Sequence, residues 1–315
     1  MSSGSALPFF THMHGLTRHR KTPSLLFPVI LFSLLLSLHA RGDVEAAQKG
    51  FLWKVQSGSA TVYLLGSIHV FKKELYPLPA KIEEAFQSSD ALVVEANIDE
   101  LNLETVIAML EGAFYPENEN LEGHLSKDTF ARAGAKLGES GIPIELFQRS
   151  KPWILALMIT ALEVQKSGLD PRYGIDMHFI GEARDKKRIL ELESIDYQMR
   201  LLNGFSDAEQ EAFLISTLKD ADMMKEEMDM FMRAWSTGDT QALESIVMKG
   251  VGEDRRVFPV YEKLLYDRNR SMASRIEEFL KTGGKYFVVV GAGHLVGEKG
   301  IVRMLKGKGY SVERP

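Results

Sequence analysis

Two copies of one short pattern, Gly-x-x-His, constrain the fold of this chain more than any other feature. The first copy follows the apolar run 63–65 and ends at His69, and the second follows the run 287–290 and ends at His294. A glycine at the end of a strand lets the backbone turn sharply, so the next side chains project from the carboxyl edge of the sheet. Open α/β sheets place their ligands at that edge. Two imidazoles from distant parts of the chain can therefore converge on one metal ion or one reacting group.

The residues around each copy predict parallel strands joined by helices. Expected strands lie at 51–55, 60–65, 91–97, 286–290 and 310–312, with expected helices at 79–88 and 300–306. A strand, a helix and a strand at this spacing form a βαβ unit with parallel strands. We therefore predict an α/β fold in which tandem βαβ halves form a mainly parallel central sheet.

The region between the halves is mainly helical in its pattern. Helices are expected over 151–166 and 261–280, and a short strand over 189–193 ends in an acid. Ser206 and Glu209 form a capping box that opens a long helix with one apolar stripe. Its methionines favour a helix-packing core, with a mobile Met-lined lid as the alternative. We predict a large helical insertion inside one mature domain, residues 50–315.

The first 40 residues have the composition of a secretory signal peptide. A basic stretch over 18–21 precedes the mostly apolar run 24–38, which is shorter than a membrane span. Cleavage is expected near Ala40 or Ala46, with an uncleaved N-terminal anchor as the alternative. Either way the body of the protein is expected to be exported, periplasmic or secreted. The chain has no cysteine, which excludes disulfides and thiolate metal sites.

The charge of the chain narrows the classes of partner, and its histidine content indicates where chemistry is expected. Residues 1–40 hold three Lys or Arg and no acid, so their removal changes the formal net charge from −5 to −8. An acidic protein is a poor candidate for binding nucleic acid or anionic membrane surfaces. Residues 1–40 also hold four of the eight histidines, and two of the remaining four lie in the repeated pattern. This enrichment favours chemistry at His69 and His294.

Four expected strand ends carry functional side chains: His69, Glu95, Glu193 and His294. Two histidines with one or two carboxylates match a divalent-metal site that leaves a position for water, with a spare carboxylate as general base. The same residues could also work without metal, with histidine as the base oriented by glutamate. The structural alternative is that each is a turn residue or a solvated edge charge.

Two further polar residues precede the second pattern. We predict that Arg268 stabilises a developing oxyanion or clamps a substrate carboxylate, with Asn269 orienting it or donating a hydrogen bond. An exposed or salt-bridged helix face is the alternative. Asp176 is expected to be a helix N-terminal acid. His178 and His124 are expected to be structural.

These residues together resemble the TraB/PrgY/GumN family, whose wider superfamily includes the TIKI metalloproteases. The resemblance covers about residues 50–315 and runs through the segments 65–70, 93–95, 174–176, 192–193 with Gln198, 268–269 and 290–297. It implies a tandem α/β fold related to the erythromycin esterase and ChaN group, and a metal-dependent hydrolytic site on His69, Glu95 and His294. Within the family, the chain resembles the exported bacterial GumN-type branch. It has no cysteine, and a C-terminal membrane-spanning segment is not expected, so Wnt-type proteolysis is not expected to transfer.

The sequence therefore predicts an exported metal-dependent hydrolase, a peptidase that uses Mn²⁺, Co²⁺ or Zn²⁺ on a peptide or another small substrate. A membrane would be a partner only if the N-terminal segment stays uncleaved. The alternative is a non-catalytic protein that uses the same cleft to bind haem, a metal or a peptide, with His69 and His294 as axial haem ligands.

Overall fold

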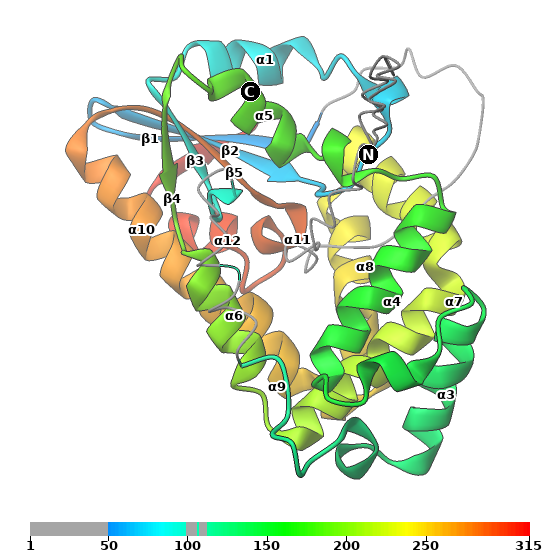
Figure 1. Cartoon of the computed structure of the whole chain (residues 1–315). Helices are drawn as coiled ribbons and strands as arrows, with labels where there is room; N and C mark the ends of the chain where they lie inside the picture. The colour runs from blue at the N-terminus through cyan, green and yellow to red at the C-terminus, as the bar shows by residue number, and fades with distance from the viewer. Residues whose placement is uncertain (1–49, 99–105, 107–111) are drawn as a thin grey trace, which may run out of the picture.

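A computed structural model describes residues 50–98, 106 and 112–315 (Figure 1). The predicted signal peptide, residues 1–40, lies outside these described residues. Among them, no helix is both long enough and apolar enough to cross a membrane.

Six strands of the described residues form one mixed sheet, in the order β4-β3-β5-β2-β1-β6. The strands are β1 (Leu52–Ser57), β2 (Ala60–Ser67), β3 (Ala91–Val94), β4 (Arg188–Glu191), β5 (Gly284–Gly291) and β6 (Ser311–Glu313). The four strands β4, β3, β5 and β2 are mutually parallel, whereas β1 pairs antiparallel with both β2 and β6. This confirms the α/β class and the mainly parallel sheet.

The strand order differs from the one expected if the two strands of each strand–helix–strand unit lay side by side. Strands β2 and β3 run parallel as expected, but β5 lies between them. The strands β5 and β6 are likewise separated by β2 and β1. The residues Phe287 to Val290 of β5 are fully buried, and a strand that is apolar on both faces is most stable in the middle of a sheet.

The pairing of β2 with β5 brings the two Gly-x-x-His patterns together. Gly66 lies opposite Val290, and Ser67 lies opposite Gly291. A Cβ atom on Gly66 would come within 2.9 Å of the Phe51 ring and 3.0 Å of Ala292. The first glycine is therefore needed because the two patterns pack against each other.

Helices cover both faces of the sheet (Figure 1). Helices α1 and α5 lie on one face and α10, α11 and α12 on the other. Their bounds are α1 (Ala80–Gln87), α5 (Ile175–Ala183), α10 (Arg268–Thr282), α11 (Ala292–Leu295) and α12 (Ile301–Gly307). Phe86 of α1 and Phe179 of α5 pack on Phe287, with ring centroids 4.8–5.5 Å apart. These contacts form the centre of the sheet core.

A second group of helices packs around its own apolar core beside the sheet (Figure 1). This core takes residues from α3 (Lys127–Gly138), α4 (Pro152–Lys166), α6 (Ile195–Asn203), α7 (Asp207–Thr237) and α9 (Phe258–Tyr261). Helix α8 (Thr240–Glu253) packs against α7, but its buried Leu243 belongs to the sheet core. Short 3₁₀ segments lie at Lys73–Leu75, Leu121–His124, Ile144–Phe147, Pro171–Tyr173 and Arg255–Val257. The predicted capping box is confirmed at the start of α7, where Ser206 and Glu209 satisfy each other's backbone N–H groups.

The helix expected over 261–280 is built differently. A π-helical turn, Glu262–Asp267, joins α9 to α10. The side chain of Arg268 donates a hydrogen bond of 3.2 Å to the backbone oxygen of Leu264. Such turns widen a helix locally, and here the wider turn delivers Arg268 and Asn269 to the buried edge of the sheet.

Candidate active site

The four parallel strands each deliver one functional side chain to the same edge of the sheet. In spatial order these are Glu193 after β4, Glu95 after β3, His294 after β5 and His69 after β2. All four are buried, with His69 7% and His294 1% exposed. The sheet pairing continues past the strands, because Glu193 N–H donates to the backbone oxygen of Glu95 at 2.8 Å.

Arg268 links the two glutamates. Its Nη2 donates to Glu95 Oε2 at 2.6 Å, and its Nε donates to Glu193 Oε2 at 2.9 Å. The side chain is buried, so these are charge-assisted bonds in a poorly solvated place. Burial disfavours the cation, but the two carboxylates keep the pKa of Arg268 above its ordinary value. The acceptors of Arg268 are thus protein groups, which favours a positioning role.

The two glutamates have opposite pKa shifts. Burial opposes charge on Glu95, but His294, Arg268, His69 and the N–H of Gly291 together hold the pKa of this carboxyl well below its ordinary value. Burial raises the pKa of Glu193, and Arg268 only partly offsets this. Glu193 Oε1 is buried with no hydrogen-bond partner among the described residues. Glu95 is therefore suited to stay ionised, and Glu193 to exchange a proton.

His294 is held in one orientation and one tautomer. Asn269 donates through Nδ2 to the backbone oxygen of Lys299 at 2.8 Å, so its Oδ1 faces the imidazole. His294 Nδ1 must therefore donate to that oxygen, at 2.6 Å. Burial lowers the pKa of His294 to about 3, with Arg268 and His69 adding to the effect and Glu95 opposing it. The imidazole is thus neutral, and its Nε2 carries a lone pair.

The Nε2 atom of His294 gives the strongest indication of a metal site. His294 Nε2 is buried and has no hydrogen-bond partner in the described part of the chain. It lies 3.7 Å from Glu95 Oε1. Two ligands of one tetrahedral zinc ion would lie about 3.4 Å apart, given bonds of about 2.1 Å. The pair is therefore spaced much like two ligands of a common ion.

His69 is oriented by an acid from a neighbouring helix. Its Nδ1 lies 2.9 Å from Asp176 Oδ1, without the alignment of a hydrogen bond. Burial opposes charge on the imidazole, but Asp176 outweighs it and raises the pKa of His69. In the neutral imidazole, a proton on Nδ1 beside Asp176 leaves the lone pair on Nε2. Both histidines thus have an oxygen beside Nδ1, as metal-bound histidines do.

The role of Asp176 was missed by the sequence reading. It lies in the first turn of α5, as expected of a helix N-terminal acid, but it also contacts His69. The close approach depends on Gly174, because a Cβ atom there would lie 2.5 Å from the backbone oxygen of His69. The sequence signal that could have pointed to this contact is the segment 174–176, which is part of the family resemblance. Gln198 also belongs to the site, since its Nε2 donates to Glu193 Oε2 at 3.3 Å.

The two remaining histidines make structural contacts, as expected. His124 lies between Glu119 and Asp207 and stacks on the ring of Tyr115. His178 packs on Tyr76, with ring centroids 4.8 Å apart.

The candidate ligand atoms are of the chemical types that bind a divalent metal ion. No three histidine, aspartate or glutamate side chains within the described ranges are close enough to hold an ion as they stand. The neutral His294 with an unpartnered Nε2, the oriented His69 and the ionised Glu95 are nonetheless the types of ligand that zinc, cobalt and manganese bind. A small cavity of about 20 Å³ adjoins His69, Glu95, Asp176 and Gln198.

Comparison with known protein families identifies the family of this chain. The model of the TraB/PrgY/gumN family matches residues 51–314. The chain belongs to this family. Family membership therefore extends over almost all of the described residues, and it confirms the resemblance drawn from the sequence.

Several TraB/PrgY/gumN relatives span most of the chain. The uncharacterized protein YbaP of Escherichia coli (strain K12) is 28% identical over 250 residues, which cover 79% of this chain and 89% of YbaP. A metalloprotease TIKI homolog of Amphimedon queenslandica is 25% identical and covers 92% of this chain and 67% of its own length. Metalloprotease TIKI1 of Homo sapiens is 22% identical and covers 85% and 62%. No solved structure matches the chain.

In this family member, we expect neutral His294 to contribute stability that is lost as the pH falls. Its folded pKa of about 3 lies below the ordinary 6.5. Between these values the unfolded chain binds more protons, so the free energy of unfolding decreases as the pH is lowered. Denaturant unfolding at about pH 7 and about pH 4.5 measures this dependence. It should be smaller in His294→Asn, and an unchanged dependence in that variant would contradict the assignment.

Proposed function

We propose that this protein is an exported, metal-dependent hydrolase, and that it is a peptidase. The observation that carries the proposal is the buried, unpartnered Nε2 of His294 beside Glu95. The relatives named metalloproteases support the reaction class. Export rests on the composition of residues 1–40. We further propose that the fold is related to the erythromycin esterase and ChaN group and that its mainly helical middle region is a large insertion between two βαβ halves.

The residues divide into ligands and their supports. His69, Glu95 and His294 would hold a Mn²⁺, Co²⁺ or Zn²⁺ ion. A bound divalent ion supplies a Lewis acid for a carbonyl oxygen and makes a nearby water more acidic. Asp176 and Asn269 keep the two imidazoles turned so that each presents Nε2.

Glu193 and Arg268 contribute the proton chemistry and the charge balance. The raised pKa of Glu193 suits a general base that takes a proton from water and returns it to the leaving amine. Arg268 keeps Glu95 ionised and fixes Glu193 through the same guanidinium. A direct contact of Arg268 with a substrate oxyanion or carboxylate stays a prediction, as does the contribution of Asn269 to it.

A broad peptide library incubated with the metal-loaded mature protein tests this function. We expect cleavage that is abolished by a chelator. We also expect Glu193→Gln to lower turnover by about 100-fold or more while keeping the fold. Mass spectrometry of the products identifies the bonds cut. Cleavage that survives chelation would instead favour metal-free His/Glu hydrolysis. An uncut library in the presence of a bound ion would favour the non-catalytic binding protein.

A further inference from the structure

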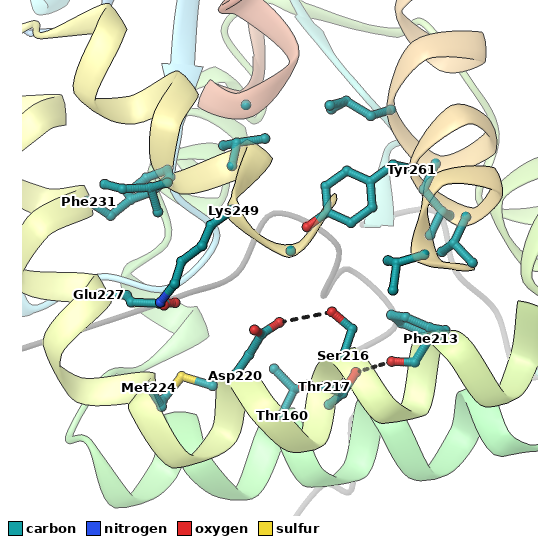
Figure 2. A pocket seen from close by; sticks show the side chains of 18 of the residues that line it. Thr160, Phe213, Ser216, Thr217, Asp220, Met224, Glu227, Phe231, Lys249 and Tyr261 are labelled. Atoms are coloured by element: carbon teal, nitrogen blue, oxygen red, sulfur yellow. Dashed lines mark hydrogen bonds and ion pairs between the residues drawn. The ribbon is translucent and has the colours of Figure 1, made fainter. Parts of the chain in front are cut away.

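A second, larger cavity adjoins the candidate active site. It has a volume of about 150 Å³ and lies between α4, α7, α8 and the turn from α9 into the π-helical segment. Its wall includes Gly293 and His294, so a group held in it lies beside the candidate metal ligands. Figure 2 shows the side chains of Ser216 and Asp220 on α7 facing the hydroxyl of Tyr261.

Apolar side chains form about half of the lining of this cavity, and several of them are buried. Its buried apolar members include Leu157, Phe213, Met224, Phe231, Val260 and Leu264. Engineered apolar cavities of about 150 Å³ in another protein accept a benzene molecule. The cavity is therefore large enough for one aromatic ring or a branched aliphatic side chain.

Glycines keep this space open. A Cβ atom on Gly250 would lie 3.0 Å from the Tyr261 hydroxyl, and one on Gly293 would lie 3.4 Å from a methyl group of Val247. Both glycines line the cavity. A larger residue at either position would reach into the volume that a ligand group would use.

The charged groups of the lining already have protein partners. Lys249 forms an ion pair with Glu227, and Asp220 accepts a 3.5 Å hydrogen bond from Ser216. A charged ligand group would lose its hydration and would compete with these contacts. An uncharged apolar group would instead gain free energy by leaving water.

We propose that this cavity is the side-chain pocket for the substrate, and that it takes an uncharged apolar side chain of the size of leucine, methionine or phenylalanine. The occupant's identity as a substrate rests on the proposed hydrolase. The preference of the pocket for an apolar side chain does not, because it can be measured by binding alone.

Binding of three blocked amino-acid amides tests the pocket. The probes are N-acetyl-phenylalanine amide, N-acetyl-alanine amide and N-acetyl-lysine amide, measured with the mature protein by ligand-observed NMR. We expect the phenylalanine amide to bind about tenfold or more tightly than the alanine amide, and the lysine amide to bind no better than alanine. Equal affinities, or a preference for lysine, would overturn the proposal.

Filling the cavity should remove that preference. Val247 lines the cavity from α8, and Val247→Phe places a ring in it, whereas Ser245→Phe adds the same ring at an exposed position of the same helix. Thr160→Phe fills the cavity from α4 and replaces Val247→Phe if circular dichroism shows that variant unfolded. We expect the phenylalanine preference to vanish in a folded filling variant and to persist in Ser245→Phe. A preference that survives both filling variants would overturn the proposal.

The same measurement separates this inference from the proposed hydrolase. Glu193→Gln, which lies outside the lining of this cavity, should lower turnover and still discriminate phenylalanine amide from alanine amide. A wild-type protein that discriminates the amides but cleaves no peptide would refute the hydrolase and leave the apolar pocket standing. A protein that cleaves peptides without regard to an apolar side chain would refute the pocket alone.

Discussion

Arg268→Met is expected to destabilise the protein by about 3–5 kcal/mol. The substitution removes the partner of two buried carboxylates, Glu95 and Glu193, and leaves their charge uncompensated. Denaturant unfolding near neutral pH measures the loss. Arg268→Lys keeps the charge but lacks the fork that reaches both acids, so it should fall between the wild type and Arg268→Met.

Arg270→Met is the matched control for this change. Arg270 lies on the same helix, and its ion pairs with Glu262 and Asp267 are at the surface. Removing such pairs costs about 1 kcal/mol or less. Equal losses for Arg268→Met and Arg270→Met would show that the buried link between the glutamates contributes no more stability than the surface ion pairs of Arg270.

Gly174→Ala is expected to damage both the fold and the site. The added Cβ would meet the backbone oxygen of His69 at 2.5 Å and its carbonyl carbon at 2.9 Å, and neither atom can rotate away. We expect a loss of about 1–3 kcal/mol in the free energy of unfolding as the helix start shifts. Asp176 should then move from His69, so the pKa of this imidazole should fall, which NMR titration detects.

Gly181 of the same helix provides the control. Within the described part of the chain, no atom lies within 4 Å of a Cβ built on Gly181, apart from its own helix backbone and neighbours. Gly181→Ala should therefore leave the His69 titration unchanged and stabilise the helix by about 0.5–1 kcal/mol. If both alanine variants behave alike, the close approach of Gly174 to His69 is not what positions Asp176.

The carboxyl edge could be predicted from sequence because its signals are local. A glycine or an acid directly after an apolar run marks the end of a strand, and parallel strands end at one edge. His69, Glu95, Glu193 and His294 were found in this way, and the structure places them on four neighbouring strands. Their chemical roles stay predictions.

The remaining features depend on tertiary contacts. The apolar run of β5 indicates a strand buried on both faces, but β3 has a similar run. The run therefore does not by itself show that β5 separates β2 from β3. An acid in the first turn of a helix is already explained by the helix start. The contact of Asp176 with His69 is therefore not apparent from the sequence. The π-helical turn before Arg268 has no distinctive residue pattern, and the pairing of Arg268 with both glutamates depends on that turn.

Metal binding by the mature protein tests the central claim most directly. Metal analysis and calorimetry with Mn²⁺, Co²⁺ and Zn²⁺ should give about one ion per chain for the wild type and for His124→Ala, whose imidazole makes only structural contacts. His69→Ala and His294→Ala should lose the ion, because each removes one oriented imidazole from the edge of the sheet. Equal binding by the wild type and His294→Ala would contradict a metal site at the paired Gly-x-x-His patterns.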